Sequence, residues 1–344
     1  MTNILRPARF GGPVTRYIHT LDGDGSYPYY SLGSAWDGGS ASWYVTAEIA
    51  TTYAAAAQDI FSAGTFALVV RLRSDGKLEA WVNFTQITSS APTVDLLDGK
   101  LHKIKVSWDS GTTYVSFDID DGTWSETVNT AVTYTTQQIN YIGARDASNN
   151  PLIGQILSVD INGEHGYSFD SNSTSTVADT IGSNDLTMNN FTSSDIVEYT
   201  WETDAAGGGE AGWLGPENVF DPGFDNASLW YQTDGTFDVT GGTLVADGDE
   251  GIGDAIFPSS DGSYGNRLLL TPGVYLYAAT VSSYTSGSLK WRAVSNPVVE
   301  FSAAGYHAEL DTLTIAGVNS RIVVGSTGAQ SISDCSVKSF IEVE

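Results

Sequence analysis

Cysteine is almost absent from this 344-residue chain, in which Cys335 is the only example. One thiol cannot form an intrachain disulfide or a zinc site built on thiolates. Long apolar runs are absent too: no segment approaches the roughly 20 apolar residues that cross a bilayer. The first residues lack the apolar core of a signal peptide. We therefore expect a protein that is made in the cytoplasm and has no membrane partner.

Basic residues are scarce, with 15 Lys and Arg against 41 Asp and Glu and a net charge of −26. Such a surface repels phosphates, so we expect no nucleic-acid partner. The charge is uneven, because residues 1–16 carry Arg6, Arg9 and Arg16 and no acid. This segment is either a frayed terminus or a basic arm that anchors the protein to an acidic surface, such as another copy of the chain.

Patterns that would indicate an enzyme are missing. The closest approach to the E-x-D-x-x-E pattern of glycosidases is Glu309-Leu310-Asp311, which lacks the final acid. No nucleophile elbow of the G-x-S-x-G type lies near a histidine, and no HExxH or phosphate-binding loop is present. The sequence therefore predicts a non-enzymatic protein. The four histidines are His19, His102, His165 and His307.

Alternating apolar and polar residues dominate what is present. Residues 103–108 and 114–119 alternate on either side of a turn, and residues 66–72 and 77–84 do the same, which predicts two hairpins. Only residues 51–58 hint at a helix, and they are too few to form a stable one. We predict an all-β fold. Further strands are expected over 274–281, 289–294, 313–315, 321–324 and 337–343.

A glycine-rich, acidic stretch over residues 202–215 contains three consecutive glycines, which is typical of a flexible linker. The chain is long enough for two domains of ordinary size. We therefore predict two β-sandwich (jelly-roll) domains in tandem, over residues 17–201 and 216–344.

Five segments of the first domain resemble the concanavalin A-like, laminin-G-like sandwich family. The most specific segment is Asp98–Asp109, a turn leading into a strand. The five segments occur along the chain in the same order as in the family. This resemblance implies the fold, whereas members of the family bind glycans or proteins or have no known ligand. The other segments are residues 42–47, 59–64, 141–145 and 154–161.

The second domain resembles galactose-binding-like jelly rolls, which occur as carbohydrate-binding modules and in phage fibres. The resemblance rests on an opening motif over residues 218–225 and on a Pro-Gly turn leading into a strand over residues 270–275. The combination of these two module types resembles phage structural proteins.

Glycan binding requires exposed aromatic rings that stack on sugars. The candidates are aromatic residues of a Gly- and Ser-rich segment in the first domain, which could instead bury against a neighbouring subunit, and three aromatic residues of the second domain. The tryptophans Trp43, Trp81, Trp108 and Trp230 are interpreted as core residues. The candidates for sugar stacking are Tyr27, Tyr29, Tyr30 and Trp36 in the first domain and Tyr231, Tyr284 and Trp291 in the second.

Acidic loops offer one candidate cofactor, a structural Ca²⁺, which jelly rolls often carry. The densest cluster is Asp247, Asp249 and Glu250, and a second acidic loop holds Asp22 and Asp24. The competing interpretation, which we favour, is a solvated acidic turn.

The expected function is that of a non-enzymatic, surface-exposed phage virion protein, as a fibre, tail or capsid decoration component that contacts host-surface glycans. Its location would be the virion surface and its partners other virion proteins. Particle symmetry favours a homo-oligomer, and analogy suggests a trimer. The alternatives are a bacterial carbohydrate-binding module pair and a structural cement protein without a ligand.

Overall fold

The structure is a computed structural model of the whole chain. Within the part that it describes, no helix is long and apolar enough to cross a membrane. The described residues are 15–21, 27–133, 138–146, 149–202, 211–217, 231–232, 237–239, 243–247, 253–256, 268–270, 273–284, 289–293, 296–301, 303–313, 318–324 and 329–342.

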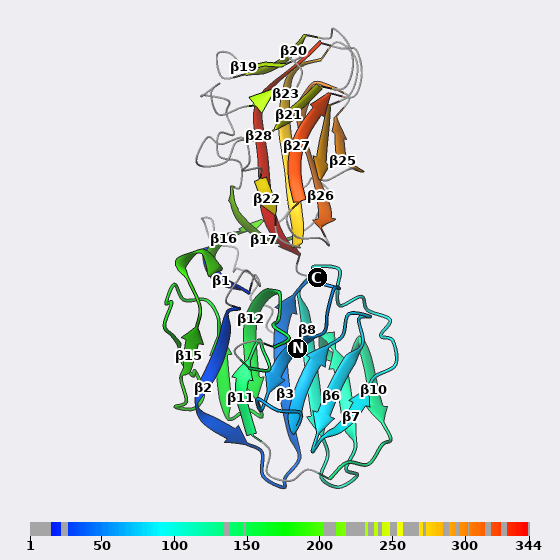
Figure 1. The fold of residues 1–344 in the computed structure, drawn as a ribbon, viewed down its shortest axis with the longest axis vertical. Coiled ribbons are helices and arrows are strands. Elements are labelled where there is room, and N and C mark those ends of the chain that lie inside the picture. The colour runs from blue at the N-terminus through cyan, green and yellow to red at the C-terminus, as the bar shows by residue number, and fades with distance from the viewer. Residues whose placement is uncertain are drawn as a thin grey trace. The chain divides into compact units, whose positions relative to one another are not determined.

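The all-β prediction is confirmed (Figure 1). Over the described ranges the only helices are two 3-10 turns, η1 Asp120–Gly122 and η2 Ser193–Asp195. The chain separates into two compact units on either side of the Trp201–Glu202 bond. We call them the first and second units and describe each by itself.

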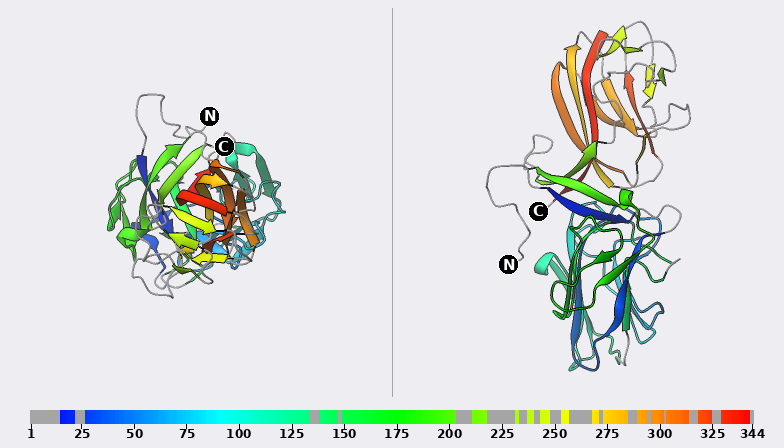
Figure 2. Two further views of the ribbon diagram at one scale, coloured as in Figure 1. Left: turned by 90° about the horizontal axis from the view of Figure 1, so that it is seen from above. Right: turned by 90° about the vertical axis from the view of Figure 1, so that its left-hand side faces the viewer.

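One sheet of the first unit, the β8 sheet, has the order β10-β9-β8-β3-β12-β1-β16, and β13 also pairs with β12. Figure 2 shows β16 beside β1, where the two strands pair in antiparallel fashion. The strands are β1 Thr15–Leu21, β3 Trp43–Ala50, β8 His102–Trp108, β9 Val115–Ile119, β10 Trp124–Val128, β12 Gly154–Ile161, β13 His165–Ser168 and β16 Ile196–Glu202.

The opposite sheet of the first unit, the β5 sheet, has the order β14-β15-β2-β11-β4-β5-β6-β7. Both predicted hairpins are present, because β8 pairs with β9 and β5 pairs with β6. The strands are β2 Tyr29–Asp37, β4 Gln58–Ser62, β5 Leu68–Leu72, β6 Leu78–Val82, β7 Thr85–Thr88, β11 Gln138–Ile142, β14 Thr176–Val177 and β15 Leu186–Asn189.

One hydrophobic core joins the two sheets of the first unit. Ile104 and Val106 of β8 belong to the same buried cluster as Leu68 and Val70 of β5. Successive side chains of a strand point to opposite faces, so the intervening residues lie on the outer faces of the sandwich. On the outer face of the β5 sheet, the alternation places the charged residues Asp59, Arg71 and Glu79 together.

The second unit also contains two antiparallel sheets. In one of them, β28 pairs with β17, β20 and β23, while β19 pairs with β20 and β26 pairs with β23; the other has the order β18-β21-β27-β24-β25, with β22 also on β27. The strands are β17 Gly212–Glu217, β18 Tyr231–Gln232, β19 Phe237–Val239, β20 Leu244–Asp247, β21 Gly253–Ile256, β22 Leu268–Leu270, β23 Gly273–Tyr284, β24 Leu289–Ala293, β25 Asn296–Phe301, β26 Gly305–Leu313, β27 Val318–Val324 and β28 Ala329–Glu342.

Two boundaries differ from the sequence-based expectation. Residues 212–215, expected at the end of a flexible linker, form the start of β17, because Trp213 pairs with Ile341 of β28 and is buried. Arg16, expected in a basic arm, lies in β1 opposite Tyr199 of β16. Burial lowers the pKa of Arg16, while the charges of two nearby acids oppose that effect. Arg6, Arg9 and the glycines of the linker lie outside the described residues.

Candidate carbohydrate-binding face

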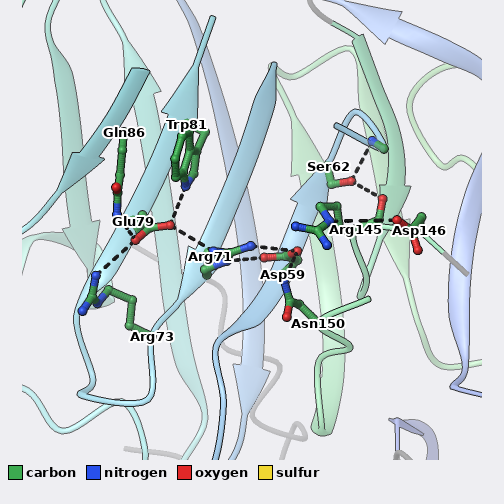
Figure 3. A network of polar contacts seen from close by, with 11 residues as sticks. Asp59, Ser62, Arg71, Arg73, Glu79, Trp81, Gln86, Arg145, Asp146 and Asn150 are labelled. Carbon is green, nitrogen blue, oxygen red and sulfur yellow. Dashed lines mark hydrogen bonds and ion pairs between the residues drawn. The ribbon is translucent and has the colours of Figure 1, made fainter. Parts of the chain in front are cut away.

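Cross-strand register builds a row of charges on the outer face of the β5 sheet. Asp59 of β4 lies opposite Arg71 of β5, and Arg71 lies opposite Glu79 of β6. Figure 3 shows Arg71 between the two carboxylates. Opposite charges in directly facing positions stabilise a sheet. The row runs across three strands and links them through their side chains.

Arg71 holds both acids with its guanidinium group. Its Nε donates to Asp59 Oδ1 at 2.5 Å, and its Nη1 donates to Glu79 Oε1 at 3.2 Å. The side chains of Asp59 and Glu79 are 0% and 3% exposed, so water contributes little to either charge. Burial raises the pKa of Asp59, although the hydrogen bond and charge of Arg71 oppose this effect.

Glu79 also fixes a tryptophan. Trp81 Nε1 donates to Glu79 Oε1 at 2.5 Å, while Gln86 Nε2 and Arg73 Nη1 donate to Glu79 Oε2 at 2.6 and 3.2 Å. The indole of Trp81 is partly exposed. A ring held by a charged hydrogen bond loses little conformational freedom when a ligand stacks on it.

An aromatic and cationic cluster surrounds the indole. The Trp81 and Phe66 rings lie 4.5 Å apart between centroids at an angle of 44°. The guanidinium carbons of Arg71 and Arg145 lie 5.6 and 4.7 Å from the Phe66 centroid. These cation–π contacts cover Phe66 and orient it against Trp81.

A second aromatic pair lies on β2 and β11 of the same sheet. The rings of Tyr29 and Tyr141 are 5.9 Å apart and meet edge to face. Tyr141 pairs across the sheet with Ser62 of β4. Burial and neighbouring groups raise the pKa of Tyr29, which keeps its hydroxyl protonated. We call the surface from Trp81 and Phe66 to Tyr29 and Tyr141 the aromatic face.

The charges of the aromatic face are compensated within it. Arg71 contacts two carboxylates, Arg73 contacts Glu79 and Asp75, and Arg145 Nε lies 3.9 Å from Asp146 Oδ2. A charged ligand would have to compete with these ion pairs. The arrangement can therefore offer aromatic stacking and hydrogen bonds to a ligand without net charge.

The sequence-based candidates divide sharply on this surface. Tyr29 lies on the aromatic face and is partly exposed, and Tyr27 is partly exposed beside it in the chain. Tyr30 and Trp36 are 0% and 3% exposed, so the prediction that they stack on sugars is wrong. Alternation along β2 turns both rings into the core, where Tyr30 Oη contacts His19 Nδ1 at 2.8 Å.

Among the tryptophans interpreted as core residues, Trp43 and Trp108 are buried. Trp81 is not, because Leu78, Ala80 and Val82 occupy the inward positions of β6. The alternation over residues 77–84 already indicates that Trp81 points outward, because it falls between the apolar residues Ala80 and Val82. Trp230 lies outside the described residues.

The candidates of the second unit are only partly described. Tyr284 ends β23 and is partly exposed. The backbones of Tyr231 and Trp291 lie in β18 and β24, on the sheet whose strands run β18-β21-β27-β24-β25, while their side chains lie outside the description.

The candidate calcium ligands fall largely outside the description. Asp247 ends β20, its side chain is not described, and Asp249, Glu250, Asp22 and Asp24 are outside the described residues. Within the described ranges, no group of three or more His, Cys, Asp or Glu side chains is arranged to hold a metal ion. Calcium therefore stays a prediction.

Two histidines of the first unit have structural surroundings. His102 Nδ1 lies 2.8 Å from Asp120 Oδ2 and its Nε2 lies 3.1 Å from Asp98 Oδ1. Burial disfavours the charged imidazole, but the two carboxylates outweigh it and raise the pKa of His102 to about 9. His19 is buried, and burial lowers its pKa. Nε2 of His19 donates to the Ser171 carbonyl, so Nδ1 accepts from Tyr30.

A second surface feature is a shallow hollow of about 560 Å³ on the outer face of β8, β9 and β10. Two pairs of its polar groups contact each other: Lys103 Nζ lies 2.8 Å from Asp121 Oδ1, and the Ser116 and Thr127 hydroxyls lie 2.7 Å apart. Its lining contains a single aromatic residue, Phe117, which is buried. The aromatic face combines stacking rings with polar groups, and we therefore take it as the candidate site.

No protein-family model matches the chain, and no curated protein matches its sequence. Among solved structures, a putative carbohydrate binding protein from Bacteroides ovatus has a TM-score of 0.39 at 14% identity and matches 54% of this chain and 60% of its own. Mouse laminin α1 domains LG4-5 have a TM-score of 0.36 at 12% identity and cover 98% and 86%. A heptameric SAP-like pentraxin from Limulus polyphemus has a TM-score of 0.35 at 12% identity and covers 43% and 75%.

Proposed function

We propose that the protein is a non-enzymatic, glycan-binding surface protein and that the aromatic face of the first unit binds a neutral oligosaccharide. The observation that carries this proposal is the partly exposed indole of Trp81, fixed by Glu79 and supported by Phe66. Sugar rings stack on such platforms, while flanking polar groups bind hydroxyls. Gln86 is exposed beside Trp81 and, besides the N–H that it donates to Glu79, has an amide oxygen that can accept from a sugar hydroxyl.

The class of ligand follows from charge. The three arginines of the aromatic face are paired with carboxylates of the same face. An acidic saccharide would meet no unpaired cation there and would approach a chain with a net charge of −26. A neutral oligosaccharide avoids both costs.

The carboxylates of the face do not favour catalysis. A glycosidase needs a protonated acid and a second carboxylate on either side of one bond. Asp59 and Glu79 are both buried, and each accepts hydrogen bonds from Arg71. Neither is therefore arranged as a proton donor to a glycosidic oxygen.

The wider setting predicted from the sequence belongs to the same proposal. It comprises the surface of a phage virion, other virion proteins as partners, and a homo-oligomer. The strong negative charge and the tandem sandwiches are consistent with such a coat or fibre component, and the solution mass of the full chain would measure the oligomeric state. The bacterial module pair shares the glycan-binding activity, whereas the cement alternative lacks it.

Replacing Trp81 with alanine tests the proposal. We expect wild-type protein to bind at least one of cellohexaose, xylohexaose, laminarihexaose, maltohexaose and chitohexaose in calorimetric titration, and to bind polygalacturonate weakly or not at all. Trp81→Ala should weaken binding at least about tenfold, as truncation of a central aromatic contact does.

Tyr306→Ala is the matched control, because Tyr306 is 66% exposed and lies in the second unit. It should bind like wild type. Trp81→Phe keeps a ring and should lose less affinity than Trp81→Ala. Full affinity in folded Trp81→Ala would contradict the proposal, and silence on the whole panel would favour the cement alternative.

A further inference from the structure

The β6–β7 turn has an unexpected residue at its tip. Val82 and Thr85 pair across the hairpin, and the two residues between them, Asn83 and Phe84, have φ angles of 49° and 63°. A two-residue turn with both central φ angles positive favours Asn at the first position and Gly at the second. A bulky aromatic residue is strained there, because its Cβ crowds the backbone.

Another turn in the chain shows the usual solution. Asn162 and Gly163 have φ angles of 58° and 67°, and the Glu164 N–H donates to the Ile161 carbonyl at 3.0 Å. The second position of that turn is glycine, as its conformation favours. The corresponding conformation at Phe84 therefore gives no reason for an aromatic side chain.

Burial gives no reason either. Phe84 is 64% exposed, one of the three large hydrophobic side chains identified as exposed among the described residues. An apolar ring left in water gains little of the hydrophobic stabilisation that a buried one provides. Backbone strain that the fold does not need is concentrated at functional sites, where binding uses it.

The position of Phe84 connects it to the aromatic face. Its N–H donates to the Phe66 carbonyl at 3.2 Å, and the Asn83 N–H donates to the Ala67 carbonyl at 2.7 Å. The turn thus lies directly against the segment that carries Phe66, whose ring is 4.5 Å from Trp81. The backbone of Phe84 therefore lies beside the backbone of Phe66, which carries the ring that packs on Trp81.

We propose that Phe84 is a sugar-contacting residue that extends the binding site for a neutral oligosaccharide from Trp81 to the tip of the β6–β7 turn. This inference rests on the proposed function. It explains why a strained, exposed phenylalanine occupies a position where glycine would relieve the strain. Phe84 contributes affinity at a cost in stability, as contact residues of binding sites often do.

Two substitutions separate the ring from the strain. Phe84→Gly removes both, so it should raise the thermal midpoint by about 1–3 °C, after the entropic cost of glycine is included. The same variant should bind the tightest of the five hexasaccharides roughly three- to tenfold more weakly. Phe84→Ala removes only the ring and should lose the same affinity without the gain in midpoint.

Thr113→Gly is the matched control. Thr113 has a φ of 62° in the turn between β8 and β9, which belong to the opposite sheet. It should raise the midpoint while leaving affinity unchanged. The inference is overturned if Phe84→Gly lowers the midpoint, or if both Phe84 variants bind like wild type while Trp81→Ala does not. Undiminished binding by both Trp81→Ala and the Phe84 variants would instead overturn the proposed function together with the inference.

Discussion

Replacing Arg71 with methionine is expected to lower the free energy of unfolding by about 3–5 kcal/mol, the range for removing one partner of a buried ion pair. Arg71 is the shared counter-ion of Asp59 and Glu79, whose side chains are 0% and 3% exposed. Without it, Asp59 keeps Asn150 as a hydrogen-bond donor at 3.4 Å but loses the cation that donates hydrogen bonds to it, and Arg145 acts on it only through its charge. Urea denaturation at pH 7 measures the change.

The matched control is Arg73→Met. Arg73 contacts the same Glu79 at 3.2 Å, but its side chain is 37% exposed, so its loss should cost under about 1 kcal/mol. Equal free energies of unfolding for the two variants would show that the buried row of Asp59, Arg71 and Glu79 does not stabilise the sheet.

The deficit of Arg71→Met should shrink under acid. Burial already raises the pKa of Asp59, and removing Arg71 raises it further. A carboxyl group with a raised pKa favours folding when it is protonated and opposes folding as pH rises through the folded-state pKa. The difference between variant and wild type should therefore be smaller at pH 4.5 than at pH 7, and an unchanged difference would contradict burial of this charge.

The raised pKa of His102 predicts a second large effect, a fall in the free energy of unfolding in the alkaline range. Its pKa rises from the ordinary 6.5 to about 9 in the folded state. A group with a raised pKa contributes its full stability below the unfolded value, and that contribution disappears as pH rises through the folded value. At 1.36 kcal/mol per pKa unit, this amounts to about 3 kcal/mol lost between pH 6.5 and 9.

Comparing wild type with His102→Gln isolates this titration, because glutamine can donate a hydrogen bond to one carboxylate but carries no proton that titrates here. The free energy of unfolding of wild type should fall towards that of the variant as pH rises from 6.5 to 9. Parallel pH profiles for the two proteins would show that His102 is not charged between Asp98 and Asp120.

The sequence was sufficient for two hairpins of the first unit. Alternation predicted both hairpins, because apolar residues at every second position specify one buried face. The same rule places Trp81 outside and Tyr30 inside. The sequence-based interpretation nevertheless put Trp81 in the core, and the Gly- and Ser-rich surroundings of Tyr30 led to the expectation that Tyr30 is exposed. Hydrophobicity indicates burial on average, whereas the register of a strand decides it for each residue.

The remaining features of the site depend on contacts between distant segments. Asp59, Arg71 and Glu79 form one row only because three strands align in a particular register. Phe66 joins Trp81 through the packing of a loop against β6. Arg16 was assigned to an arm from its charge, although β16 pairs with its strand from nearly two hundred residues away in the sequence. Local patterns do not contain such pairings.

The most direct test of the aromatic face is the indole N–H spectrum of the full-length protein labelled with ¹⁵N at its nine tryptophans. The Trp81 signal, assigned with Trp81→Phe, should shift on titration with the tightest-binding hexasaccharide, while the signals of buried Trp43 and Trp108 stay in place. Saturable binding that leaves the Trp81 signal unmoved would contradict the account.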